Sequence, residues 1–166
     1  MTSNFHFLSE RFPVLEKLGN LAESYLYSDP NTCLYKLGTL AETTINYMFE
    51  LDRLTPPYEN TLNNKIKILK NEGLLPKEID DILYRLRIKR NLAVHEGHDS
   101  FEDSKILLHM ANTFMSWFMQ TYGDYTYEPS EFILPADESQ TQDYNKLLKE
   151  KETLVAELEN VKATVA

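Results

Sequence analysis

Residues 84–95 contain the side chains best suited to chemistry, an arginine and a histidine five positions apart. The segment reads Tyr-Arg-Leu-Arg-Ile-Lys-Arg-Asn-Leu-Ala-Val-His and includes Arg90, Asn91 and His95. A histidine suits general acid–base work near neutral pH, and an arginine aimed into a cleft binds anionic groups. Whether the two can act together depends on the helix that carries them.

Arg90 falls on the inward face of the helix that Pro76 is expected to open. At about 100° per residue, one buried stripe collects Ile79, Ile82, Leu83 and Leu86, and Arg90 lies inside that stripe. A buried guanidinium without a partner is costly, so a carboxylate such as Glu42 or Glu23 is expected to pair with it. The alternative is an arginine aimed into a cleft or a subunit interface.

His95 lies about 140° further round the helix than Arg90, so one straight helix cannot bring the two side chains together. The two side chains converge only if the helix ends near Asn91, or if a second protomer supplies one member of the arginine–histidine pair. We expect His95 to cap the last carbonyl groups of its helix. Glu96, His98 and Asp99 follow without the H-E-x-x-H zinc spacing, so they predict a polar turn rather than a metal site.

A basic cluster is predicted on two neighbouring helices, although the protein carries a net charge of −9. Clustered cations within an acidic protein suit either a solvated surface or a patch that meets nucleic acid or an acidic partner. The candidate nucleic-acid-binding residues are Lys65, Lys67, Lys70, Arg85, Arg87 and Lys89.

The composition excludes several classes of protein. None of the 5 glycines forms a phosphate loop or a dinucleotide-binding motif, so no nucleotide cofactor is expected for this segment. No run of residues is long and apolar enough for a membrane helix, and residues 1–10 lack a signal-peptide pattern. The single cysteine, Cys33, fits a reducing cytoplasm and is read as a core residue.

Stop signals and helical periodicity predict an all-α bundle over residues 1–123. The main signals are Pro13, Asp29-Pro30, Pro56-Pro57, Gly73, Pro76, Gly97 with its following caps, and Gly123. The last helix is expected to bury Ile106, Leu107, Met110, Phe114, Trp117 and Phe118. Residues 124–138 read as an extended strap that packs on the bundle.

Residues 139–166 carry an unbroken heptad pattern and are predicted to form a coiled-coil helix. Spacings of three and four join Tyr144, Leu147, Lys151, Leu154, Leu158, Val161 and Val165. Lys151 at an a position weakens the seam but can set its register. We expect this helix to start a linker to further domains, and a homodimer through it is possible.

Seven short matches in order resemble the N-terminal helical domain of type I restriction enzyme R subunits, over residues 4–135. The first is Asn4-Phe5-His6-Phe7-Leu8 with Pro13, followed by Leu21-Ala22-Glu23, Asp29-Pro30, Leu40-Ala41-Glu42, Pro57-Tyr58 with Leu62, Arg90-Asn91-Leu92-Ala93-Val94-His95 and Phe132-Ile133-Leu134-Pro135. The resemblance implies a non-catalytic accessory domain for assembly or nucleic-acid contact. The parent protein would be an ATP- and Mg-dependent endonuclease that works with methylase and specificity subunits on DNA.

The same domain is similar to HEPN proteins, helical bundles whose active members cleave RNA as dimers. That resemblance implies Arg90 as the stabiliser of a charged phosphate, His95 as acid and base, and Asn91 as the adjacent polar residue. Because of Arg90 and His95, a HEPN-type dimeric ribonuclease or toxin-like RNA-binding protein is the alternative function. Many R-subunit relatives carry Gly where Arg90 stands and Arg near the position of Gly38, which suggests that the motif serves packing in those relatives.

Overall fold

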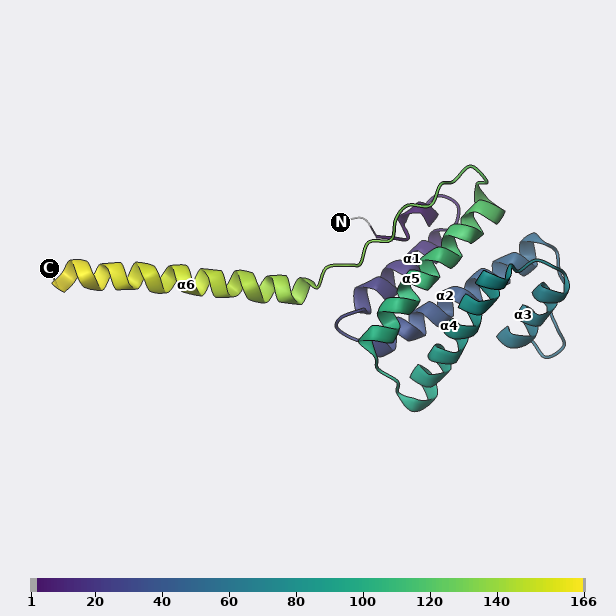
Figure 1. The fold of residues 1–166 in the computed structure, drawn as a ribbon, viewed down its shortest axis with the longest axis horizontal. Coiled ribbons are helices and arrows are strands. Elements are labelled where there is room, and N and C mark those ends of the chain that lie inside the picture. The colour runs from purple at the N-terminus through teal and green to yellow at the C-terminus, as the bar shows by residue number, and fades with distance from the viewer. Residues whose placement is uncertain (1–2, 166) are drawn as a thin grey trace. The chain divides into compact units, whose positions relative to one another are not determined.

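The computed structural model describes residues 3–165, without the side chains of 138–143 and 165, and this part contains helices and no strands (Figure 1). The predicted all-α class is confirmed. The chain forms two compact units, Met1–Leu134 and Pro135–Ala166. The first holds α1 (Pro13–Tyr25), α2 (Pro30–Leu51), α3 (Leu62–Asn71), α4 (Lys77–Glu96) and α5 (Phe101–Phe118). The second holds α6 (Glu138–Val165).

The helices begin and end where local side-chain chemistry directs them. Asp29 accepts a hydrogen bond from the Thr32 amide at 3.2 Å, and Pro30 opens α2. Ser100 caps α5 in the same way through the Asp103 amide, also at 3.2 Å. These bonds satisfy amide groups that the first helical turn leaves without partners.

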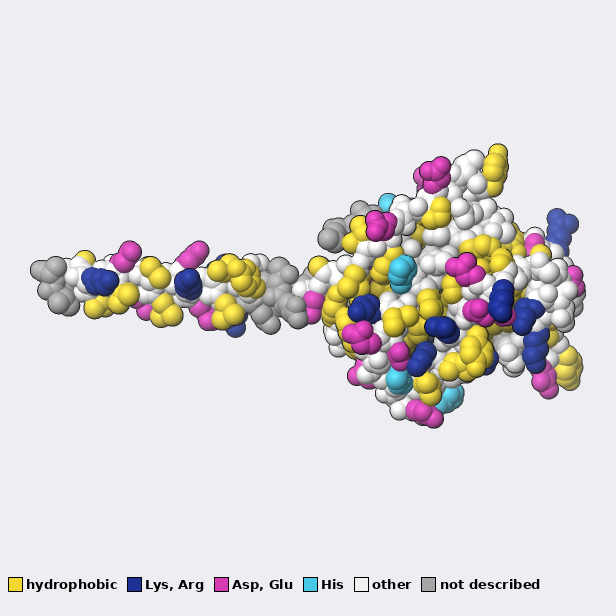
Figure 2. Space-filling view, viewed as in Figure 1, with side chains coloured by type: hydrophobic (Ala, Val, Ile, Leu, Met, Phe, Trp, Pro, Cys, Tyr) yellow, Lys and Arg dark blue, Asp and Glu magenta, His cyan; other side chains and the backbone are white. Residues whose placement is uncertain are grey.

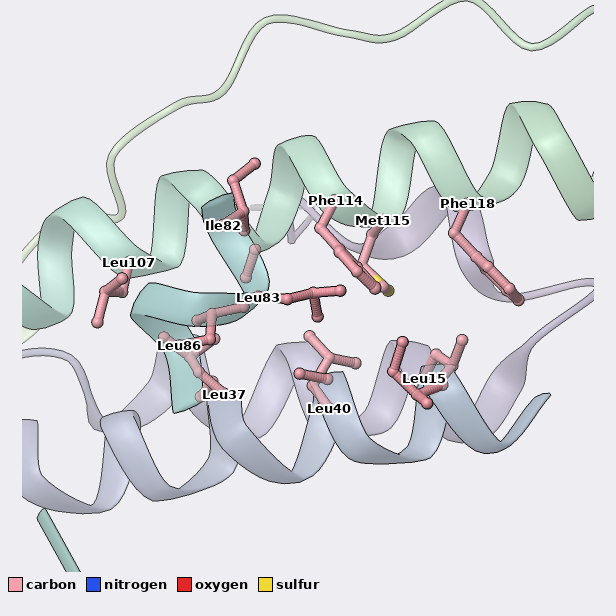
Figure 3. Packing of buried hydrophobic residues seen from close by; sticks show 14 of the residues in the cluster. Leu15, Leu37, Leu40, Ile82, Leu83, Leu86, Leu107, Phe114, Met115 and Phe118 are labelled. Atoms are coloured by element: carbon pink, nitrogen blue, oxygen red, sulfur yellow. The ribbon is translucent and has the colours of Figure 1, made fainter. Parts of the chain in front are cut away.

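The core of the bundle lies around α2, which packs against α1, α4 and α5. In Figure 3, Leu83 and Leu86 of α4 approach Leu37 and Leu40 of α2, and side chains of α5 close the core from the other side. Burying each such side chain stabilises the fold by roughly 1.5–3 kcal/mol. The fully buried residues of this core include Leu15, Leu37, Leu40, Ile45, Met48, Phe114 and Phe118.

Two expectations about the core have different outcomes. Cys33 is buried as predicted, and desolvation raises the pKa of its thiol to about 12. The expectation for Ile106 is wrong, because this side chain is 48% exposed. It lines a groove between α4 and α5 that leaves it open to solvent.

Beyond α5, a π-helical turn (Met119–Gly123) ends at Asp124, and residues 124–137 contain no regular element apart from a turn. The chain then runs back along α5 (Figure 1), with Tyr127 near Gln120 and Phe132 near His109. The Phe132 ring stacks on the His109 ring at a centroid distance of 4.5 Å. Residues 124–134 are called the strap below, and they bring Phe132 and Leu134 to the rim of a groove on the bundle.

Candidate functional site

The candidate site is built where α4 crosses α2 at a glycine. A Cβ atom added to Gly38 would overlap Arg90 Cγ and stand 2.7 Å from Arg90 Cβ, closer than real Cβ atoms approach other heavy atoms. The absence of a side chain at Gly38 therefore makes room for the stem of Arg90. The Arg90 side chain is only 19% exposed, so the predicted inward position is confirmed.

The guanidinium of Arg90 reaches the carboxylate of Glu42, one helical turn beyond Gly38. The Nη1 atom donates a hydrogen bond to Glu42 Oε2 at 3.3 Å. Of the two predicted partners, Glu42 is the one that pairs with Arg90. Glu23 instead accepts hydrogen bonds from the backbone and side chain of Asn4. The pair joins two helices and leaves about half of the Glu42 side chain, 47%, exposed to solvent.

His95 does not take the capping role expected of it. The ring is exposed in the last turn of α4 and has no hydrogen bond to another described residue. Instead, the side-chain amide nitrogen of Asn31, at the start of α2, donates hydrogen bonds to Ala93 O at 2.9 Å and to His98 O at 2.8 Å. Gly97 then ends α4 with φ +65°, a left-handed conformation that glycine adopts readily.

Arg90 and His95 do not converge within this chain. Helix α4 continues without a break past Asn91 to Glu96, so the two side chains project from different sides of it. Asn91 is half-buried directly after Arg90. Within one protomer, Arg90 and His95 therefore cannot act together on one phosphate.

The turn after α4 uses its polar residues to hold the fold together. His98 Nε2 lies 2.7 Å from Asp103 Oδ2, and Lys89 Nζ lies 3.0 Å from the same oxygen. The hydrogen bond with His98 and the interactions with Lys89 hold the pKa of Asp103 below its usual value of 3.8. The Asp99 carboxylate accepts a hydrogen bond from the backbone N–H of Asn31 at 3.0 Å. Across residues 3–165, the described side chains form no His, Cys, Asp and Glu cluster suited to a metal ion.

The six predicted basic residues do not form one continuous cationic surface. Contrary to the prediction, Lys65 does not lie on an exposed cationic surface. It is only 8% exposed, and its ammonium group donates a hydrogen bond to Asn46 Oδ1. Its long aliphatic stem allows it to lie on the bundle while its head meets a polar side chain at the edge. Lys70 pairs with Asp80 at 3.1 Å, and Lys89 pairs with Asp103.

The remaining three basic residues are placed differently. Lys67 is exposed on α3, and Arg87 lies over the ring of Tyr84 at 5.6 Å. Arg85 lines a groove between α4 and α5. Acidic, basic and hydrophobic side chains are interspersed over the face of the bundle in Figure 2, rather than sorted by charge.

That groove has a volume of about 690 Å³ and was not predicted from the sequence. Its apolar lining includes Ile106, Met110, Phe132 and Leu134, and charged groups of both signs surround it: Glu78, Asp81, Arg85 and Lys105. The exposed Ile106 could have indicated it only if the position of α4 were known. A surface with this mixture is more typical of a protein contact than of a phosphate-binding patch.

Taken with the fold, the comparisons identify the class of protein. The chain belongs to the family described as "Domain of unknown function (DUF4145)", whose model matches residues 20–160. No solved structure matches the chain closely enough to count as similar. The described helices include none that is both long enough and apolar enough to cross a membrane.

A curated relative connects the chain to restriction systems. The chain is 28% identical over 134 residues to the type I restriction enzyme EcoKI endonuclease subunit of Escherichia coli (strain K12). The match covers 80% of this chain and 11% of the relative, so the chain spans about a tenth of that protein. The protein is therefore related to a type I restriction enzyme subunit.

Proposed function

We propose that this chain is an N-terminal accessory domain of a type I restriction enzyme R subunit, and that it serves assembly rather than catalysis. The observation that carries the proposal is the pairing of Arg90 with Glu42 over Gly38, combined with the similarity to an endonuclease subunit. An arginine whose stem fills a helix crossing, and whose head meets a carboxylate, joins two helices. It is not presented to a substrate.

The parent protein would be an ATP- and Mg-dependent endonuclease on DNA, with nucleotide and nuclease sites outside this chain. The partners of the accessory domain would be the methylase and specificity subunits. The groove between α4 and α5 offers exposed apolar side chains for such contact, with Ile106 48% and Leu134 44% exposed.

A binding experiment tests the assembly role. The full chain is immobilised and exposed to the purified methylase–specificity core, and the wild type is compared with Ile106→Asp. A matched control is Val14→Asp, because Val14 is similarly exposed, at 50%, and lies on α1 outside the groove. Loss of binding in the groove variant alone supports the proposal, and failure of the wild type to bind the core overturns it.

A second arm separates nucleic-acid contact from assembly. Lys67→Glu with Arg87→Glu, at two cluster positions outside the groove, is compared with Arg11→Glu with Lys17→Glu, which makes the same change of charge elsewhere on exposed positions. Duplex DNA binding that only the first pair abolishes would assign the basic cluster a nucleic-acid role. Cleavage of single-stranded RNA by the wild type, lost in His95→Ala, would instead favour the HEPN-type ribonuclease.

A further inference from the structure

Helix α6 presents an apolar seam that no other described part of its own unit covers. Its seam residues are strongly exposed, with Leu147 at 63%, Leu154 at 65% and Leu158 at 56%. Tyr144 and Val161 extend the seam at the same three- and four-residue spacing. A helix that follows a strict seven-residue repeat buries such a seam by winding round another helix.

We propose that α6 pairs with α6 of a second copy of this chain as a parallel, in-register, two-stranded coiled coil. This inference does not rest on the proposed function. The charged residues beside the seam identify the occupant and its direction. With Tyr144, Lys151 and Leu158 at a positions, Glu150 and Glu157 occupy g positions and Lys162 occupies an e position.

Charge complementarity favours the parallel arrangement. In a parallel pair, a g residue lies beside the e residue five positions further on in the other helix, so Glu157 meets Lys162 of the second copy. Lys151 at its a position faces Lys151 of the second copy, and Glu150 of that copy lies beside it, within reach of its flexible stem, so that the carboxylate offsets the repulsion between the two lysines. Each of these attractive contacts occurs twice, because the two helices are equivalent.

The antiparallel arrangement is disfavoured by the same residues. When Leu147 is opposite Leu158 of an antiparallel partner, g positions face g positions, and Glu150 meets Glu157 of the second copy twice. Like charges directly opposite one another are repulsive. Lys151 also sets the number of helices, because an a-position lysine reaches solvent in a two-stranded coil but is enclosed in larger bundles.

The association is tested on the full chain by sedimentation equilibrium at concentrations up to roughly 100 µM, a range that detects micromolar affinities. The wild type is expected to form dimers. Lys151→Glu places two carboxylates at the seam beside Glu150, and it should weaken dimerisation at least about tenfold. Lys149→Glu is the matched control, because it makes the same change of charge two residues away on the outer face and should leave the dimer intact. Glu150→Lys added to Lys151→Glu should restore dimers.

Disulfide trapping tests direction and register. Leu147→Cys alone and Leu158→Cys alone should each form a crosslinked dimer under mild oxidation, because equivalent positions face one another in a parallel pair. The native Cys33 is buried and so does not compete. A crosslink that appears only when the two variants are mixed would show an antiparallel pair. That result, a wild type that stays monomeric, or equal effects of the two lysine variants would overturn the proposal.

Discussion

The stem of Arg90 occupies the space that a side chain at Gly38 would fill. The two positions form a steric pair across α2 and α4, and only one of them can carry a large side chain. Glu42 lies one turn beyond Gly38 on α2, within reach of an arginine on either helix.

Gly38→Ala is therefore expected to destabilise the bundle, although alanine favours helices. The gain in helix propensity is about 1 kcal/mol, but overpacking against Arg90 costs about 1–3 kcal/mol. Urea unfolding should show a net loss, whereas Thr39→Ala, at the neighbouring position, should change little. A Gly38→Ala variant more stable than the wild type would contradict the close packing of α2 and α4.

Exchanging Gly38 and Arg90 should restore the stability that a large side chain at position 38 alone removes. Gly38→Arg alone forces two arginines into one space, but Gly38→Arg with Arg90→Gly places an arginine four residues before Glu42 on the same helix. A pair at that spacing stabilises a helix by about 0.2–0.5 kcal/mol. The double variant should unfold at higher urea concentration than Gly38→Arg alone, and strict additivity of the two changes would contradict the coupling.

The features of this site that the sequence predicts are those whose cause is local. Helical periodicity places Arg90 inward, and the Asp29-Pro30 pair opens α2, because each signal depends on residues within one or two turns. Glu42 could be named as a partner because the inward guanidinium of Arg90 requires a carboxylate. The sequence alone offered Glu23 as an equally suitable partner.

The features that the sequence does not predict depend on long-range contacts. The helix cap from Asn31 reaches Ala93, which lies 62 residues away, and no spacing rule links those positions. Lys65 seemed a surface cation, but its neighbour Asn46 belongs to a different helix. The groove depends on where α4, α5 and the strap meet, so the exposure of Ile106 could not be read from α5 alone.

Asn31→Asp is expected to be more destabilising than Asn31→Ala. Alanine leaves the carbonyl groups of Ala93 and His98 without a donor, which costs about 1–3 kcal/mol. Aspartate in addition directs a negatively charged carboxylate at those carbonyl oxygens, and the two acceptors repel one another. Asn63→Asp, in the first turn of α3, is the control, because a negative charge near a helix N-terminus is tolerated. Chemical unfolding measures all three, and equal stability of Asn31→Asp and the wild type would exclude the capping role.

Asp103 should make the fold sensitive to acid. Its pKa is lower in the folded than in the unfolded chain, so its stabilising contribution is present above the unfolded value and is lost as pH falls through the folded value. The stability difference between the wild type and Asp103→Asn should therefore be largest near neutral pH and shrink below about pH 4. Glu102→Gln, an exposed neighbour, should show a smaller difference throughout. A difference for Asp103→Asn that does not change with pH would contradict the pairing with His98 and Lys89.

Asn4 fastens the strap to the bundle through hydrogen bonds that resemble those of a paired strand. Its side-chain oxygen accepts from the Ile133 amide at 2.9 Å, and its amide nitrogen donates to Ile133 O at 2.8 Å. Asn4→Ala removes both bonds, so the Ile133 amide should exchange its hydrogen faster and chymotrypsin should cleave sooner near Phe132. The control is Asn63→Ala, at an exposed position of α3, which should leave both rates unchanged. Unaltered exchange at Ile133 in Asn4→Ala would mean that the stacking of Phe132 on His109 is enough to hold the strap in place.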